Sequence, residues 1–209
     1  CAIDDNGVQC WGANGSGQTD VPIDLVNPVA VSTYYSHTCS LDDNGLQCWG
    51  NNQYGQTNVP TDLVNPVEIS AGEYYNCAID DNGVHCWGLE RKRREIKIPT
   101  TLVNPVGVST HWKFTCVIDG DRVQCWGGNN QYGEMDVPNL SNPVAVSSGS
   151  SFACAIDDNG VQCWGNNQYK STDVPTNLVN PVALSAGQFH TCAIDDNGVQ
   201  CWGYNGDGQ

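Results

Sequence analysis

Twelve cysteines recur along the 209-residue chain in six pairs, and the members of each pair are nine positions apart. The pairs are Cys1 and Cys10, Cys39 and Cys48, Cys77 and Cys86, Cys116 and Cys125, Cys154 and Cys163, and Cys192 and Cys201. Thiols in such numbers can form disulfides, bind zinc or remain reduced as small core residues. The spacing lacks the short Cys-x2-Cys knuckle of zinc sites. An even number in a regular pattern favours disulfides in an oxidising compartment, so we predict six disulfides in a secreted or cell-surface protein, against the alternative of reduced core thiols.

Each cysteine pair brackets a turn sequence, most often Asp-Asp-Asn-Gly, which is typical of a hairpin. If the turn is centred on Asn6–Gly7, the two cysteines lie diagonally across the hairpin. If it is centred on Asp5–Asn6, Cys1 faces Cys10 at a distance that a disulfide can span. The variant Asp-Gly-Asp-Arg at 119–122 keeps turn-tolerant residues at the centre of the second register. We therefore favour the second register.

The sequence between the cysteines is nearly copied, and CAIDDNGVQCWG occurs verbatim at 1–12, 154–165 and 192–203. Short strands in copied units of about 40 residues, without helical periodicity, are typical of the blades of a β-propeller. We expect one all-β domain over 1–209, with the six tryptophans of the Trp-Gly pairs in its core. Its repeats are 1–38, 39–76, 77–115, 116–153, 154–191 and a partial 192–209.

The stretch CWGNNQYGQTNVP, followed by NPVEISAGEYYNCAID, resembles the repeats of the regulator of chromosome condensation family. Trp-Gly-x-Asn-x-x-Gly-Gln is the most specific element, and the resemblance covers essentially the whole chain. It implies a β-propeller, commonly of seven blades, in which each repeat contributes strands to adjacent blades. The motif GQTxVP and the short repeats are more similar to bacterial secreted members, including propeller-type β-lactamase inhibitors, than to the nuclear exchange factor. Six hairpins accompany only five Asn-Pro-Val strands, so we expect six or seven blades in the complete protein and an incomplete ring in this chain.

Positions that vary between near-identical repeats are the candidates for function. One variable segment precedes each first cysteine, and tyrosine- and tryptophan-rich loops on a rigid scaffold are typical of protein-binding surfaces. Equivalent loops of a propeller emerge on one face, so we predict partner binding there; the alternative is that some rings only cover blade junctions. The predicted residues are Tyr34, Tyr35, Tyr74, Trp112, Lys113 and Phe189.

The second variable segment follows each Trp-Gly, and its third copy is basic in a chain whose formal net charge is −15. Residues 89–98 hold five cations and two anions, a net of +3 that leaves −18 for the rest. Such a charge repels nucleic acid and anionic membranes, and no segment approaches the about 18 apolar residues of a membrane span. We predict contact with an acidic patch on an unknown protein partner, against the alternative of a solvated insertion, by Arg91, Lys92, Arg93 and Arg94. Whether the two variable segments share a face stays open.

Catalytic chemistry is sparse in this sequence. His37 and His190 share a repeat position that holds tyrosine or phenylalanine elsewhere, which favours packing; His111 is unmatched. No nucleophile is flanked by a base and an orienting group, and the copied aspartates lack the spacing of a calcium loop. We therefore predict no catalytic residue, metal or cofactor. The primary hypothesis is a protein-binding propeller, such as an enzyme inhibitor or adhesin-like module. The alternatives are a propeller lyase or hydrolase, with His111 and carboxylates in one pocket, and an intracellular exchange-factor-like propeller.

Overall fold

The secondary structure of this chain consists of β-strands. The computed structural model describes residues 1–89 and 96–209, and these residues contain no helix. The chain divides into two compact units, Cys1–Thr100 (unit 1) and Thr101–Gln209 (unit 2). The strands of unit 1 are β1 (Ala2–Asp4), β2 (Gly7–Gln9), β3 (Ala30–Tyr34), β4 (His37–Asp42), β5 (Gly45–Gly50), β6 (Glu68–Ala71), β7 (Tyr75–Asp80) and β8 (Gly83–Gly88). The strands of unit 2 are β9 (Pro105–His111), β10 (Phe114–Asp119), β11 (Arg122–Gly127), β12 (Ala145–Ser148), β13 (Phe152–Asp157), β14 (Gly160–Gly165), β15 (Ala183–Ala186), β16 (His190–Asp195) and β17 (Gly198–Gly203).

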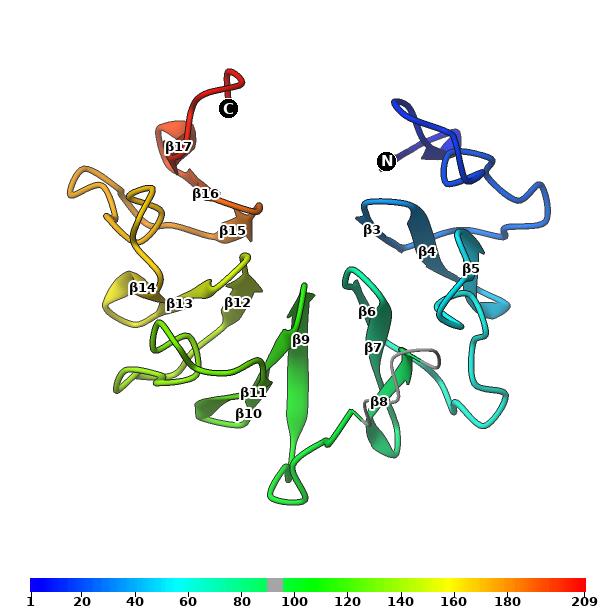
Figure 1. Cartoon of the computed structure of the whole chain (residues 1–209), viewed down its shortest axis with the longest axis horizontal. Helices are drawn as coiled ribbons and strands as arrows, with labels where there is room; N and C mark the ends of the chain where they lie inside the picture. The colour runs from blue at the N-terminus through cyan, green and yellow to red at the C-terminus, as the bar shows by residue number, and fades with distance from the viewer. Residues whose placement is uncertain (90–95) are drawn as a thin grey trace. The chain divides into compact units, whose positions relative to one another are not determined.

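The described strands form five three-stranded antiparallel sheets and one two-stranded hairpin, β1-β2. Within each sheet the strands follow the order of the chain, as β3-β4-β5 does in unit 1 and β12-β13-β14 in unit 2 (Figure 1). The first strand of a sheet ends one sequence repeat, and the other two strands begin the next repeat. The predicted all-β blades, with strands drawn from adjacent repeats, are therefore confirmed.

The hairpin between the second and third strands has the register in which the cysteines face each other. In β4-β5, Asp42 pairs with Gly45 and Cys39 pairs with Cys48. All six predicted disulfides are present, and their Cα–Cα distances of 4.0–4.1 Å fit directly opposed, non-hydrogen-bonded positions. In the variant hairpin the positive φ moves to Gly120, and Arg122 pairs with Asp119. The register therefore survives a change of turn sequence.

The end of each sheet at which the second strand turns into the third is called here the hairpin-tip end. Its first aspartate accepts hydrogen bonds: Asp157 accepts from the backbone N–H groups of Ser141 and Asn159, each at 2.8 Å, and from Gln162 Nε2 at 2.8 Å. Burial alone raises the pKa of Asp157, but these hydrogen bonds outweigh it and lower the pKa below its usual value. The second aspartate, Asp158, accepts from the exposed Asn142 Nδ2 at 2.5 Å. The copied carboxylates therefore fix the loop that leads into each sheet.

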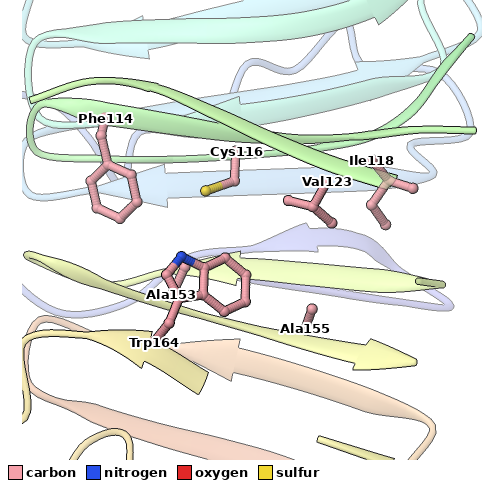
Figure 2. Close-up of a cluster of buried hydrophobic side chains, with 7 residues drawn as sticks. All are labelled: Phe114, Cys116, Ile118, Val123, Ala153, Ala155 and Trp164. Atoms are coloured by element: carbon pink, nitrogen blue, oxygen red, sulfur yellow. The ribbon is translucent and has the colours of Figure 1, made fainter. Parts of the chain in front are cut away.

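Neighbouring sheets within a unit pack face to face through apolar side chains. Figure 2 shows such a cluster between the sheet of β10 and β11 and the sheet of β13 and β14 in unit 2. Trp164 lies in this cluster, and its Nε1 donates a hydrogen bond to the carbonyl oxygen of Glu134 at 3.0 Å. First strands are also joined, because Ser109 Oγ accepts the N–H of Ser148 at 2.9 Å. The cluster consists of Phe114, Cys116, Ile118, Val123, Ala153, Ala155 and Trp164.

The prediction that all six repeat tryptophans are core residues is wrong for Trp11. Four of them, Trp49, Trp87, Trp126 and Trp164, are buried, but Trp11 is 69% exposed. The tryptophan of a sheet packs toward the sheet before it, as Trp164 does against β10 and β11. The hairpin β1-β2 has no earlier sheet in this chain on which Trp11 could pack.

Candidate partner-binding surface

The two kinds of variable segment meet at one end of each sheet, opposite the hairpin tips, where they come from successive repeats. We call this the turn end. There the first strand turns into the second, and the chain returns to this turn after the third strand. The N–H of Asn166 donates to the carbonyl oxygen of Ser151 at 2.8 Å, and the N–H of Tyr204 donates to that of Phe189 at 2.9 Å. The two variable segments therefore share a face, which the sequence alone left open.

The glycine of each Trp-Gly pair makes this close approach possible. Gly165 has φ +100°, and a Cβ atom there would lie 2.6 Å from the Ser151 carbonyl oxygen and 2.8 Å from Phe152 Cα. Real Cβ atoms do not approach backbone atoms so closely, and the positive φ is itself unfavourable for other residues. The copied glycine thus brings two variable loops together.

At the turn end of unit 2, aromatic residues from successive sheets line one groove of 450 Å³. Trp112 and Phe189 come from the turns between first and second strands, and Tyr132 and Tyr169 come from the loops after the third strands. Asparagine, glutamine and serine side chains also line the groove, together with the charged residues Lys113 and Glu134. Such a mixture of rigid rings and small polar groups resembles the composition of binding surfaces that recognise proteins. We call this feature the unit 2 groove.

Trp112 and Lys113 form the turn between β9 and β10. Trp112 is 37% exposed and has φ +29°. Lys113 Nζ lies 3.8 Å from the centroid of the Trp112 ring, so the ammonium group covers the ring in a cation–π contact. Two of the predicted binding residues therefore form a single amphipathic projection at the groove.

In unit 1, two of the predicted tyrosines, Tyr34 and Tyr74, interact with the carboxylate of Glu73. Tyr35 is 89% exposed in the turn between β3 and β4. Tyr74 packs on Tyr54, with ring centroids 4.7 Å apart, and a hydrogen bond with Glu73 raises the pKa of Tyr74 to about 12. Burial, followed by the charge of Glu73, raises the pKa of Tyr34 to about 12. These two phenols therefore stay neutral at physiological pH.

The predicted cationic contact residues Arg91, Lys92, Arg93 and Arg94 lie outside the described residues. Their contact with an acidic partner stays a prediction.

Sequence reasoning missed four tyrosines of the turn end. Tyr54 packs on Tyr74, Tyr132 and Tyr169 line the unit 2 groove, and Tyr204 packs on Tyr169 with centroids 5.5 Å apart. Three of them belong to the stretch Asn-Asn-Gln-Tyr of the second variable segment, in which only the basic copy was singled out as a candidate. The available signal was a tyrosine that recurs in a loop rich in asparagine and glycine. Such a loop does not form a strand, so its tyrosine is not packed into a sheet and can lie at the surface.

The histidines serve packing and hydrogen bonding. His37 is 1% exposed, and its Nε2 donates to Asn76 Oδ1 at 2.7 Å. Burial lowers the pKa of His37 despite this bond, and it lowers the pKa of the buried His111 to about 4. His111 lines neither of the two cavities described for unit 2. His85 takes the place of the hairpin glutamine, with its Nε2 3.0 Å from Asp80 Oδ1.

The described part of the chain offers neither a cluster of metal ligands nor a membrane-spanning helix. Residues 1–89 and 96–209 hold no group of three histidine, cysteine or acidic side chains placed to bind a metal ion. The same residues include no helix with the length and apolar character of a membrane span.

The family model described as the Regulator of chromosome condensation (RCC1) repeat matches residues 29–56, 144–170 and 182–209. These three segments are RCC1 repeats. The predicted resemblance is confirmed, and the RCC1 motif at 49–56 has a structural purpose. Its last residue, Gln56, is buried, and its carbonyl oxygen accepts hydrogen bonds from Trp87 Nε1 at 3.0 Å and from Asn76 Nδ2 at 2.6 Å.

Solved structures show the same fold. The entire ectodomain of the receptor kinase CR4 from Physcomitrella patens matches with a TM-score of 0.80 at 23% identity, over 99% of this chain and 61% of that one. Prp20p from Saccharomyces cerevisiae matches with a TM-score of 0.68 at 18% identity, over 84% of this chain and 57% of that one. The ectodomain of the Arabidopsis thaliana receptor kinase ACR4 matches with a TM-score of 0.56 at 23% identity, over 93% and 86%. This chain thus spans about three fifths of the first two proteins. No curated protein sequence matches it significantly.

Proposed function

We propose that this chain is a protein-binding module that works in an extracellular, oxidising environment and holds its partner on the turn end. The observation that carries the proposal is the unit 2 groove, in which rings from successive sheets line 450 Å³ of open space. Aromatic side chains on a rigid scaffold provide contact area at low cost in conformational entropy. The variable residues therefore lie on the surface that would contact a partner.

The disulfides and the charge support this environment and this class of partner. All twelve cysteines are paired, which indicates an oxidising compartment. A formal net charge of −15 disfavours nucleic acid. Prp20p binds Gsp1p and histones, and the CR4 and ACR4 structures are receptor ectodomains. Protein recognition and extracellular display thus both occur on this fold.

The finer role that we propose is that of an enzyme inhibitor or adhesin-like module. It rests on the likeness of GQTxVP and the short repeats to bacterial secreted propellers, including inhibitors of β-lactamases. In this proposal Arg91, Lys92, Arg93 and Arg94 contact an acidic patch of the partner, where electrostatic attraction mainly speeds association.

The test uses the intact chain as bait for surface and secreted proteins of the producing organism. A turn-end variant carries Trp112→Ser, Tyr132→Ser and Tyr169→Ser. A matched variant carries Val106→Ser, Val144→Ser and Val182→Ser, which also replaces exposed apolar side chains but near the hairpin tips. We expect the first variant to lose a partner that the second retains, with equal melting temperatures. Retention of every partner by the turn-end variant would show that the proposal is wrong.

A further inference from the structure

We infer that a second cavity at the turn end of unit 2 is a binding site for an organic cation, an alkylammonium head group. The cavity has a volume of 290 Å³ and is lined by Tyr169, Phe189, Tyr204 and Asp207, together with Gln188, His190 and Gln209. Three aromatic rings and one carboxylate around one space are the chemistry that recognises such a group. The inference does not depend on the proposed protein binding, because small molecules can test it.

The three rings come from separate segments and form one cluster. Tyr169 lies in the loop after β14, Phe189 in the turn between β15 and β16, and Tyr204 directly after β17. Their ring centroids are 4.6 Å apart for Tyr169 and Phe189, 5.5 Å for Tyr169 and Tyr204, and 6.3 Å for Phe189 and Tyr204. Ring faces carry negative quadrupole potential, so each ring face that borders the cavity would attract a cation.

The charge of the lining selects a cation over other ligands. Asp207 is the only carboxylate among the described lining residues, and no lysine or arginine is among them. An anion would be repelled by this carboxylate and by a chain of net charge −15. A neutral apolar ligand would desolvate the carboxylate without compensating it, which is unfavourable. An ammonium group satisfies both the rings and the carboxylate.

Another turn of the same unit already uses this chemistry. Between β9 and β10, Lys113 Nζ lies 3.8 Å from the Trp112 ring centroid. The equivalent turn between β15 and β16 has Gln188 and Phe189 at these positions, so its rings receive no lysine from the turn itself. The cavity volume of 290 Å³ is ample for a trimethylammonium group and lies near the lower end of ordinary ligand sites, about 300 Å³.

An ammonium head group has two possible sources, a free small molecule and a lysine side chain of a protein. Isothermal titration at mildly alkaline pH distinguishes them with four probes. Choline and its neutral isostere 3,3-dimethylbutan-1-ol test the charge, and Nα-acetyl-lysine methylamide with its Nε-trimethyl form tests the side chain. We expect choline to bind at least about fivefold more tightly than the isostere. Binding of choline alone indicates a small-molecule site, and binding of the lysine probes indicates a protein side chain; both support the inference.

Variants of the intact chain locate the binding. Tyr204→Leu and Asp207→Asn should each weaken choline binding about fivefold or more. Tyr132→Leu is the matched control, because Tyr132 lines the unit 2 groove but not this cavity, and its affinity should stay unchanged. Equal melting temperatures show that the fold is intact. The inference is overturned if no cation binds, if the isostere binds as tightly as choline, or if both cavity variants keep full affinity. None of these results bears on the capture experiment of the proposed function.

Discussion

The two ends of one strand, β13, are stabilised in different ways. At the turn end Phe152 is buried, and Gly165 lies against its backbone. At the hairpin-tip end Asp157 is buried, and it accepts hydrogen bonds from two backbone N–H groups and two side-chain amides. The tip sequence Asp-Asp-Asn-Gly is copied in most repeats, whereas the turn sequence changes in each.

This difference explains where the repeats are free to vary. Hydrogen bonds to a carboxylate require particular side chains at particular positions, so the tip tolerates few substitutions. The turn is stabilised by backbone contacts and buried rings. Its outward side chains are therefore not needed for folding and can vary. Tyr35 at 89% exposure and Trp112 at 37% exposure occupy such outward positions. Variation therefore gathers on the end that packing stabilises.

The largest expected effect compares two glycines on opposite ends of β14. Both Gly160 and Gly165 have φ +100°, but only at Gly165 would a Cβ meet backbone atoms. Gly165→Ala should lower the free energy of unfolding by about 3–4 kcal/mol, from strain and overpacking together. Gly160→Ala should cost about 1 kcal/mol from strain alone. Urea denaturation measures both, and equal losses would contradict the steric difference between the ends.

The next effect is a pH dependence of stability that arises at the turn end, from His111. Burial holds the pKa of His111, at the turn end, at about 4, while an unfolded imidazole titrates near about 6.5. The unfolded chain therefore takes up the proton first as the pH falls. The stability due to neutral His111 is complete above about pH 6.5 and declines toward pH 4, by about 2–3 kcal/mol. In His111→Tyr, which copies Tyr34 at the equivalent position, thermal denaturation between pH 7 and 4 should show a shallower slope. An unchanged slope would mean that His111 is not the titrating group.

A smaller loss is expected at the hairpin tip. Asp157→Asn removes a charged acceptor of four hydrogen bonds and should cost about 2 kcal/mol, whereas Asp158→Asn, at an exposed pair, should cost about 0.5 kcal/mol. Because the folded pKa of Asp157 is lowered, its contribution is present above the ordinary value of about 3.9 and is lost as the pH falls through the folded pKa. Guanidinium denaturation at pH 7 and pH 3 measures both effects. The difference between wild type and Asp157→Asn should shrink at pH 3, and a constant difference would exclude the carboxylate charge as its cause.

The smallest effect concerns a residue that departs from its copies. Lys170 has φ +62° at the position where Gly133 has φ +74°. Lys170→Gly should raise the free energy of unfolding by about 0.5 kcal/mol, because relief of backbone strain exceeds the entropy that glycine adds to the unfolded chain. Gly133→Ala is the reciprocal control and should lower it by about 1 kcal/mol. Differential scanning calorimetry resolves the two shifts, and changes of the same sign would contradict the strain argument.

The local features of this fold were accessible from the sequence. Hairpin register and disulfide pairing follow from nine-residue spacings around a turn, and the variant at 119–122 tested the register. The burial of His37 followed from the aromatic residues that replace it in other repeats. These features depend on neighbours along the chain, which a repeat sequence displays directly.

The missing parts depend on contacts between segments. Tyr169 was not singled out as a candidate, because its stretch Asn-Asn-Gln-Tyr recurs in other repeats, yet it lines both cavities. Copying shows that a position is shared between repeats but does not show that it is buried. Trp11 was expected in the core although its hairpin has no earlier sheet to cover it. The two variable segments lie together because of backbone hydrogen bonds such as that between Asn166 and Ser151. The repeat pattern of the sequence does not reveal such a contact.

The nine-residue separation within every disulfide bears on how this protein matures. Twelve thiols can pair in about ten thousand ways if all meet at once. A chain that enters an oxidising compartment from one end presents each hairpin before the next has followed, and closing so short a loop takes well under a microsecond. Each cysteine therefore meets its native partner first. Lengthening the array by another repeat adds one more local pairing and leaves the others undisturbed.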